Sequence, residues 1–349
     1  MDKKRFLIYA VLLAVLLLLM YMQFRTWRNF DWATFLSQTD HVSKRHILHA
    51  IGLIYLAYAI RAFRWKIFLQ PVRKTSTWQM LAPTLIGFTG LALLGRPGEL
   101  IRPYLISRRM NLPFSSQLAV WAVERIFDIA AFTILLVLTA FVATAPKRLD
   151  TYELFQKVSV AFALLSTVLI IGAFAVHRSG EGLAKWVERR FSHLSANLGN
   201  RIGLRIREFH SGLNTIGSVW SLLALAALSV AMWAMIAVAY KEVTHSYAVE
   251  ALEIPQTQVL LLMGSSMVGS LIQLPGVGGG SQLATIATLR HVFDVPQELA
   301  ASCGIMLWLV TFVAVIPVGL FLAHNERLSL RKLSQESQEE EAHAKLPPG

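Results

Sequence analysis

The stretch GRPGELIRPYLISRRMNLPFSSQLAVWAVERIFD, residues 95–128, decides how this chain folds. Its last five residues place Glu124, Arg125 and Asp128 inside an otherwise apolar run over residues 115–141. As a helix that run would be about 40 Å long, enough to cross a bilayer. Each charge at the centre of such a helix costs about 2.5 to 3.5 kcal/mol. The three side chains fall within an arc of roughly 100°, so we expect them to face a protein or water-filled interior, where Arg125 neutralises either acid.

The composition is that of a polytopic membrane protein. The 349 residues are 55% hydrophobic and 15% charged, with a mean hydropathy of +0.51. The net charge is +12, and the basic residues flank apolar runs. This placement indicates contact with anionic lipid headgroups rather than binding of nucleic acid. The single cysteine, Cys303, excludes an intrachain disulfide. We find no catalytic triad and no histidine pair with metal-ligand spacing, so no cofactor or metal is expected.

The hydropathy pattern predicts an all-α fold of eight hydrophobic segments, about six spanning helices plus two re-entrant helical hairpins. The spans are expected at residues 6–24, 46–69, 115–141, 154–176, 219–240 and 299–323. Residues 80–106 and 256–289 are interrupted by proline and glycine into limbs that are short for a span. Such broken backbone is tolerated only when it is buried in protein or faces water. The sequence favours hairpins there but does not exclude full spans.

The domain organisation and orientation follow from the same pattern. Residues 1–323 are expected to form a single transmembrane domain, with a cytoplasmic amphipathic connector at 177–218 and a polar cytoplasmic tail at 324–349. Most of the 33 Lys and Arg residues fall in segments that this topology places in the cytoplasm. The positive-inside rule therefore predicts a multi-pass protein of a bacterial-type inner membrane with both termini in the cytoplasm.

The two hairpins resemble each other and define an inverted-topology repeat. Each has a Gly-rich apolar limb, a Pro-Gly break, a short second limb and a later proline before the next span. The Pro-Gly pairs at residues 97–98 and 275–276 correspond, and this spacing places Glu99 opposite Gln282. Because the first hairpin enters from the cytoplasm and the second from outside, we predict a path between them near the midplane, as in many transporters.

Four motifs in order make the chain resemble a known family. They are RAFRW at 61–65, GRPGELIRPYLI at 95–106, ERIFD at 124–128 and LPGVGGGSQ at 274–282. Together they are similar to the lysylphosphatidylglycerol synthase transmembrane-domain family, also called flippase-like membrane proteins. The resemblance implies movement of a phospholipid, polyprenyl or hopanoid-type envelope lipid between leaflets. In the synthases a separate soluble domain transfers the amino acid, and we expect this chain to be a stand-alone member without it.

One departure from the family pattern bears on the substrate. The second break in relatives ends in glutamate, whereas this chain has Val277 and Gln282. If that glutamate binds a cationic headgroup, its replacement argues against a lysyl-lipid and for an anionic or neutral one. The predicted partners are therefore membrane lipids, with an anionic headgroup expected, and a homo-oligomer is compatible with the sequence. The residues expected to bind or transport the lipid are Arg61, Arg64, Arg96, Gly98, Glu99, Arg102, Glu124, Arg125, Asp128, Pro275, Gly276 and Gln282.

Two other interpretations of these residues stay open at this point. In the first, the protein is a membrane-embedded enzyme or accessory subunit acting on a lipid headgroup, with Glu99 or Glu124 as general base. No activated nucleophile is evident, so we expect no enzyme. In the second, Glu124, Arg125 and Asp128 form a structural ion network that locks helices together. In the transport hypothesis, four arginines, Arg61, Arg64, Arg96 and Arg102, attract a phosphate on the cytoplasmic side, and Arg125 presents a charge at the midplane.

Overall fold

The computed structural model describes residues 31–142, 156–172, 218–271, 273–274 and 278–325, with Glu153, Gly182 and Leu204 as single residues. The predicted first span at 6–24 lies outside the described residues, as do Pro275 and Gly276. The predicted connector at 177–218 and the tail at 324–349 also lie outside them, apart from a few residues. These parts of the sequence-based topology stay predictions.

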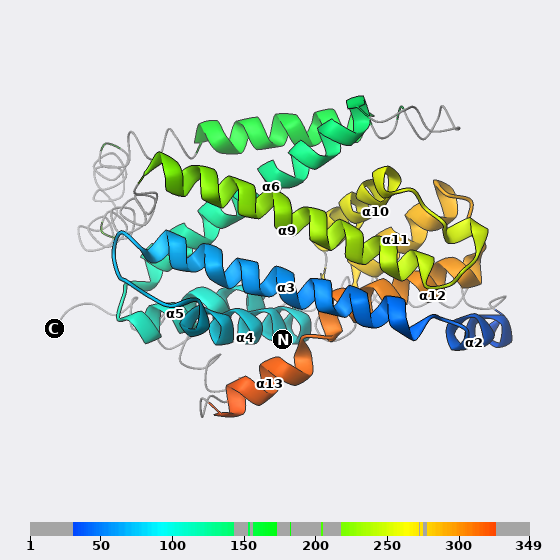
Figure 1. Ribbon diagram of the computed structural model, residues 1–349, viewed down its shortest axis with the longest axis horizontal. Coiled ribbons are helices and arrows are strands. Elements are labelled where there is room, and N and C mark those ends of the chain that lie inside the picture. Colours follow the sequence, from blue (N-terminus) through cyan, green and yellow to red (C-terminus); the bar gives the residue numbers. More distant parts are fainter. Residues whose placement is uncertain are drawn as a thin grey trace, which may run out of the picture.

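The described part of the chain is helical, which confirms the all-α prediction (Figure 1). Its α-helices are α2 (Trp32–Asp40), α3 (Lys44–Leu69), α4 (Thr77–Leu94), α5 (Ile101–Met110), α6 (Phe114–Val142), Gln156–Gly172, α9 (Val219–His245), α10 (Gln256–Gly269), α11 (Gly280–His291), α12 (Gln297–Trp308) and α13 (Ile316–Asn325). Shorter elements are the helical turns η1 (Arg96–Leu100), η2 (Glu250–Leu252) and η3 (Leu309–Val313), and the strands β1 (Gln273–Leu274) and β2 (Gly278–Gly279).

Several helices are long and apolar enough to cross a bilayer. They are α3, α4, α9 and the combined segment Gln297–Asn325. Helix α6 has 29 residues, and at 1.5 Å per residue its length of about 43 Å also suffices. It begins at Phe114, one residue before the predicted start of the apolar run. The protein is thus a multi-pass membrane protein.

Helices α3 and α9 pack side by side in opposite directions along the long axis of the molecule (Figure 1). The start of α3 lies beside the end of α9, where the Ser43 amide donates to the Ser246 carbonyl at 2.8 Å. One turn further in, His46 Nδ1 lies 2.5 Å from Glu242 Oε2. Buried apolar side chains, including Ile54 of α3 and Met232 of α9, continue this contact into the main core.

The first hairpin consists of α4, the turn at Gly95, η1 and α5. Ser76 caps α4, since its hydroxyl accepts from the Gln79 amide and the Gln79 side chain accepts from the Ser76 amide. The ends of the hairpin are joined where Arg109 donates to the Gln79 carbonyl at 3.0 Å. Helix α4 begins three residues before the predicted segment 80–106 and is 18 residues long. By length it could cross the membrane, whereas α5 with 10 residues is short.

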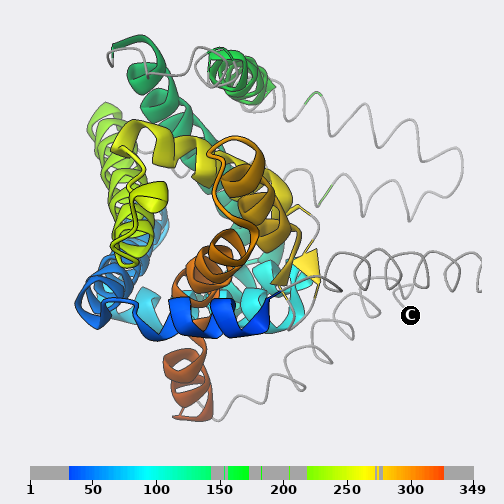
Figure 2. The same cartoon turned by 90° about the vertical axis from the view of Figure 1, so that its right-hand side faces the viewer.

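The second hairpin consists of α10, the two-residue ladder of β1 and β2, and α11. Its limbs have 14 and 12 residues, too short to span comfortably, as the sequence predicts. The two hairpins lie toward opposite ends of α3 and α9 (Figure 1). Seen from the right-hand end, the second hairpin is in front and the first behind (Figure 2).

The two hairpins share local structural features, which support the inverted repeat. In each, a glycine with positive φ precedes the returning limb, Gly95 at 71° and Gly279 at 100°, a conformation that favours glycine. In each, two limbs approach so closely that only glycine fits, at Gly98 against Gly90 and at Gly269 against Gly280. Each hairpin also follows one of the antiparallel helices α3 and α9 and precedes a further long segment, α6 or Gln297–Asn325.

The last span differs from the single helix expected at residues 299–323. Helix α12 passes into the π-helical turn η3 before α13 begins. Pro317 lacks the amide that would continue the ladder. Side chains of neighbouring helices use carbonyls of this region, where Tyr55 Oη donates to Ala314 O at 2.8 Å and Thr89 Oγ1 to Val315 O at 3.2 Å.

We expect the substitution Gly98→Ala to destabilise the first hairpin. A Cβ atom on Gly98 would meet the backbone of Gly90 and Leu91, which cannot move aside as a flexible side chain could. The overpacking should cost about 1 to 3 kcal/mol and lower the thermal unfolding temperature of the detergent-purified protein. Gly52→Ala in α3 is the matched control, because nothing lies within 4 Å of its added Cβ. Equal unfolding temperatures for the two variants would contradict this close packing.

Candidate functional site

Helix α6 carries the two buried carboxylates on which the site is built. Glu124 is fully buried and Asp128 is 2% exposed, whereas the Arg125 side chain is 31% exposed. Glu124 and Asp128 are one helical turn apart, so both face the same neighbours. The sequence predicts that Glu124, Arg125 and Asp128 face the protein interior. The low exposure of the two acids and the partial exposure of Arg125 agree with that prediction.

Asp128 is bound by two arginines of α3. Arg61 Nη1 donates to Asp128 Oδ2 at 2.8 Å, and Arg64 Nη1 donates to Oδ1 at 2.6 Å. Arg64 is completely buried, and its Nη2 also donates to the Glu124 carbonyl at 3.3 Å. The two arginines are three residues apart and therefore lie on one face of α3. Each oxygen of the carboxylate thus has its own guanidinium partner.

Glu124 is bound from α5 and α3. Arg102 donates to both carboxylate oxygens, and Trp65 Nε1 donates to Oε2 at 3.0 Å. The Arg102 guanidinium also lies 5.0 Å from the centre of the Trp65 ring, a cation–π distance. A Cβ on Gly87 of α4 would collide with Arg102, so the glycine lets α5 approach α4 at this level. The ion network expected as an alternative therefore exists and joins α3, α5 and α6.

Arg125 is the arginine that the carboxylates bind least closely. Its Nη2 lies 3.4 Å from Asp128 Oδ2 and 3.6 Å from Glu124 Oε2, longer than the hydrogen-bonded pairs. The Arg125 Nε atom is buried and has no hydrogen-bond partner among the described residues. Arg125 is within reach of both acids, as the helical spacing predicts, but other arginines carry out most of their neutralisation.

The tips of the two hairpins meet at Arg96. Its Nε donates to the Ser270 carbonyl at 2.9 Å and its Nη2 to Ser270 Oγ at 3.2 Å. Its Nη1 donates to Glu99 Oε1 at 2.5 Å within η1. One side chain thus connects η1 of the first hairpin with the end of α10 in the second. This is the meeting of tips that the inverted repeat predicts.

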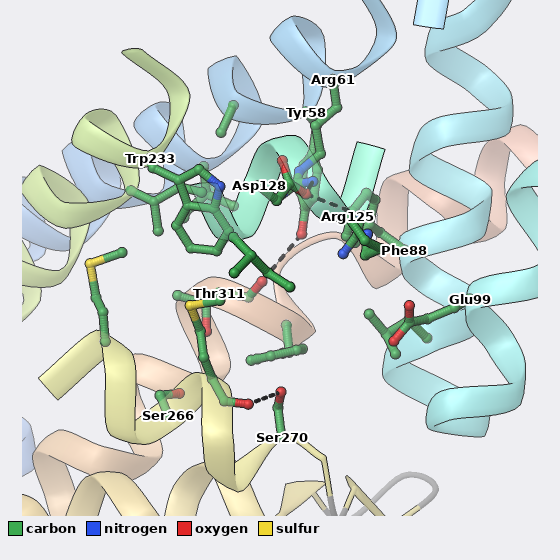
Figure 3. A pocket seen from close by; sticks show the side chains of 18 of the residues that line it. Tyr58, Arg61, Phe88, Glu99, Arg125, Asp128, Trp233, Ser266, Ser270 and Thr311 are labelled. Atoms are coloured by element: carbon green, nitrogen blue, oxygen red, sulfur yellow. Dashed lines mark hydrogen bonds and ion pairs between the residues drawn. The ribbon is translucent and has the colours of Figure 1, made fainter. Parts of the chain in front are cut away.

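A cavity of about 290 Å³ lies between the hairpins and the long helices (Figure 3). We call two parts of its lining the charged side and the hydroxyl side, which meet where Arg96 binds Ser270. The charged side consists of Arg61, Arg96, Glu99, Arg125 and Asp128. The hydroxyl side includes Ser266 and Ser270 of α10, with Tyr240 of α9 and Thr311 of η3 nearby. Apolar side chains such as Ile54, Phe88 and Phe312 complete the lining.

The structure places the predicted site residues in three groups. Those that line the cavity are Arg61, Arg96, Glu99, Arg125 and Asp128. Those behind the charged side, in the ion network, are Arg64, Arg102 and Glu124. The remaining described ones, Gly98 and Gln282, contact residues of their own hairpin. Gly98 packs on Gly90, and the Gln282 side chain accepts a hydrogen bond from the Gly279 amide at 3.3 Å. Glu99 and Gln282 lie four and three residues after their positive-φ glycines, so the predicted pairing is one residue out of register. The transport role of all of these residues stays a prediction.

Several lining residues were missed by sequence reasoning. Trp233 and Tyr240 come from α9, Ser266 and Ser270 from α10, and Thr311 from η3. A signal for Trp233 was present, because it lies midway along the 27-residue helix α9 rather than at an end, where membrane tryptophans concentrate. The two serines are four residues apart and share a helix face. Among the described residues, no three His, Cys, Asp or Glu side chains come together as a metal site would need.

We expect Asp128→Asn to destabilise the protein strongly. The change removes the carboxylate to which the buried Arg61 and Arg64 donate hydrogen bonds, and removing one partner of a buried ion pair costs about 3 to 5 kcal/mol. Glu153→Gln is the matched control, because Glu153 pairs with Lys157 at 3.4 Å on an exposed surface, where such pairs contribute at most about 1 kcal/mol. Thermal unfolding of both purified variants measures the difference. An Asp128→Asn protein as stable as the control would show that the network does not hold the helices.

A comparison with protein-family models agrees with the multi-pass membrane fold described above. The family model described as the lysylphosphatidylglycerol synthase TM region matches residues 7–319. No curated protein and no solved structure matched the chain. The family match confirms the resemblance in the four motifs and indicates a function connected with membrane lipids. Since the match covers most of its length, the chain belongs to the lysylphosphatidylglycerol synthase transmembrane-region family.

Proposed function

We propose that this protein moves a phospholipid, polyprenyl or hopanoid-type envelope lipid between the two leaflets of a bacterial-type inner membrane. The headgroup passes through the cavity between the hairpins, while the acyl or prenyl chains stay in the bilayer. The observation that carries this proposal is a cavity with a charged side, which lies between two hairpins that come from opposite ends of the molecule and touch at their tips. The family's connection with membrane lipids supports it.

The size and lining of the cavity suit a headgroup better than a whole lipid. Ligand sites usually enclose about 300 to 1,000 Å³, and this cavity of about 290 Å³ is at the lower end. Its charged and hydroxyl sides offer hydrogen bonds in a region where lipid tails offer none. A polar headgroup that enters the cavity therefore exchanges water for protein partners, which lowers the barrier to crossing.

The contact between the hairpin tips provides a barrier that can open. Arg96 bridges to Ser270 through one hydrogen bond to a carbonyl and one to a hydroxyl. A charged donor of this kind contributes about 1.5 to 3 kcal/mol for each bond, which is small enough to be broken during a transport cycle. Movement of one hairpin against the other would then expose the cavity to each side in turn, as in other inverted-repeat transporters.

The alternative, an enzyme acting on a lipid headgroup, requires an available base. Glu124 has no exposed surface and accepts from Arg102 and Trp65, while Glu99 accepts from Arg96. A general base must reach the proton it removes, and both carboxylates are already engaged by donors. Binding and alternating access need no such base, so the observed contacts favour transport.

We expect Arg125→Gln to slow leaflet exchange at least about tenfold in proteoliposomes with fluorescent lipids. The substitution keeps a polar, though shorter, side chain and removes the cation that faces the cavity. Loss of a charged hydrogen bond of about 1.5 to 3 kcal/mol corresponds to this factor. Arg45→Gln, at an exposed position near the start of α3, is the matched control and should exchange lipid as the wild type does. Equal exchange in the wild type, Arg125→Gln and empty vesicles would remove the transport proposal.

A further inference from the structure

The charges around the cavity do not balance. Among the described residues, the ion network contains Arg61, Arg64, Arg102 and the partly exposed Arg125 but only the carboxylates of Glu124 and Asp128. The formal excess is two positive charges. The Arg96 and Glu99 pair at the edge of the cavity cancels. Burying charge without a counter-ion is costly in a low dielectric, so the site as described lacks an anion.

Arg125 is the arginine of this network that offers its positive charge to a ligand in the cavity. Asp128 already accepts hydrogen bonds from Arg61 and Arg64, and Glu124 from Arg102, whereas Arg125 comes no closer to either acid than 3.4 Å. Its side chain is partly exposed to the cavity, and its Nε has no partner among the described residues. Arg125 therefore retains donors for a ligand anion, and a guanidinium binds phosphate oxygens well.

A second, independent observation points to the same place. Trp233 of α9 is 8% exposed, lines the cavity and has no hydrogen-bond partner for Nε1 among the described residues. In Figure 3 its indole nitrogen is turned toward Asp128, and the Arg61 guanidinium lies 5.8 Å from its ring centre. An indole N–H can only donate, and leaving it unsatisfied costs about 1 to 3 kcal/mol. It therefore needs an acceptor, which a ligand oxygen can supply.

A cationic headgroup finds no counterpart in the described site. The carboxylates near the cavity are Asp128, held by two arginines, and Glu99, held by Arg96. An ammonium group would meet the excess positive charge and displace an existing ion pair. The hydroxyl side presents the neutral hydroxyls of Ser266 and Ser270, which accommodate uncharged polar groups.

From these observations we infer that the headgroup carries a phosphate monoester, whose oxygens accept from Arg125 and from Nε1 of Trp233. This inference rests on the proposed transport function and names the class of lipid. A phosphate monoester has about 1.5 to 2 negative charges at pH 7 and three strong acceptor oxygens, which matches the excess of two. A phosphodiester has a single charge and leaves half of the excess unbalanced.

The test measures binding to the full-length protein in detergent by the shift in its thermal unfolding temperature. The probes are phosphatidic acid (a monoester), phosphatidylglycerol (an anionic diester), phosphatidylethanolamine (with an ammonium group) and inorganic phosphate. We expect phosphatidic acid to bind at least about tenfold more tightly than phosphatidylglycerol, a difference of about 1.4 kcal/mol. Phosphatidylethanolamine should bind more weakly than either, and inorganic phosphate more weakly than phosphatidic acid because it lacks the chains.

Two variants locate the site. Trp233→Phe keeps the ring but removes the donor, so it should reduce the preference for phosphatidic acid over phosphatidylglycerol several-fold. Trp220→Phe, on the same helix at an 81% exposed position, is the control and should retain the preference. Equal binding of the two anionic lipids, tightest binding of phosphatidylethanolamine, or an unchanged preference in Trp233→Phe would overturn the inference. Inorganic phosphate as effective as phosphatidic acid would show an anion site that does not select a lipid, which also overturns it.

Leaflet exchange of the same lipids separates this inference from the proposed function. Exchange that does not favour phosphatidic acid, together with equal binding, would leave transport standing and remove the assignment of the headgroup. Selective binding of phosphatidic acid without exchange of any lipid would remove transport, while the monoester site would remain as a binding site.

Discussion

The architecture depends on two carboxylates buried side by side in a transmembrane helix. Glu124 and Asp128 could not remain charged in hydrocarbon without partners, and arginines from α3 and α5 supply these partners at hydrogen-bond distance. This requirement fixes which face α6 turns inward and which helices lie against it. It also brings Arg102, at the start of the returning limb of the first hairpin, into the core. One wall of the cavity is thus a consequence of neutralising these acids.

The hairpins meet a second constraint, since broken backbone at membrane depth must be covered by protein. In both hairpins, glycine allows the protein to cover this backbone. Gly98 against Gly90 and Gly269 against Gly280 allow the two limbs of each hairpin to approach until their backbones are in contact. The cavity is the volume left where the two tips meet.

The proposed function and the inferred headgroup rest on different properties of the same cavity. Transport follows from the arrangement of the two hairpins, and would hold for any polar headgroup that fits between them. The monoester follows from an imbalance of charge and from an indole donor without a partner. In the proposed cycle, a phosphate would compete with Asp128 for Arg125, whose shortest ion-pair distance, 3.4 Å, is longer than that of each other arginine in the network. In that cycle, ligand entry would be coupled electrostatically to the packing of α6.

The sequence alone determined the membrane class, the two hairpins and the inward face of α6, because hydropathy, Pro-Gly breaks and helical period are local properties. It also led to the inverted repeat, and the shared glycine geometry agrees with that repeat to within one residue. Only the tertiary structure decided which arginine neutralises which acid. Arg61 and Asp128 are 67 positions apart, and their pairing depends on how α3 packs on α6. For the same reason, only the tertiary structure identified Trp233 as a residue that lines the cavity, because the cavity and the charges beside its indole come from other helices.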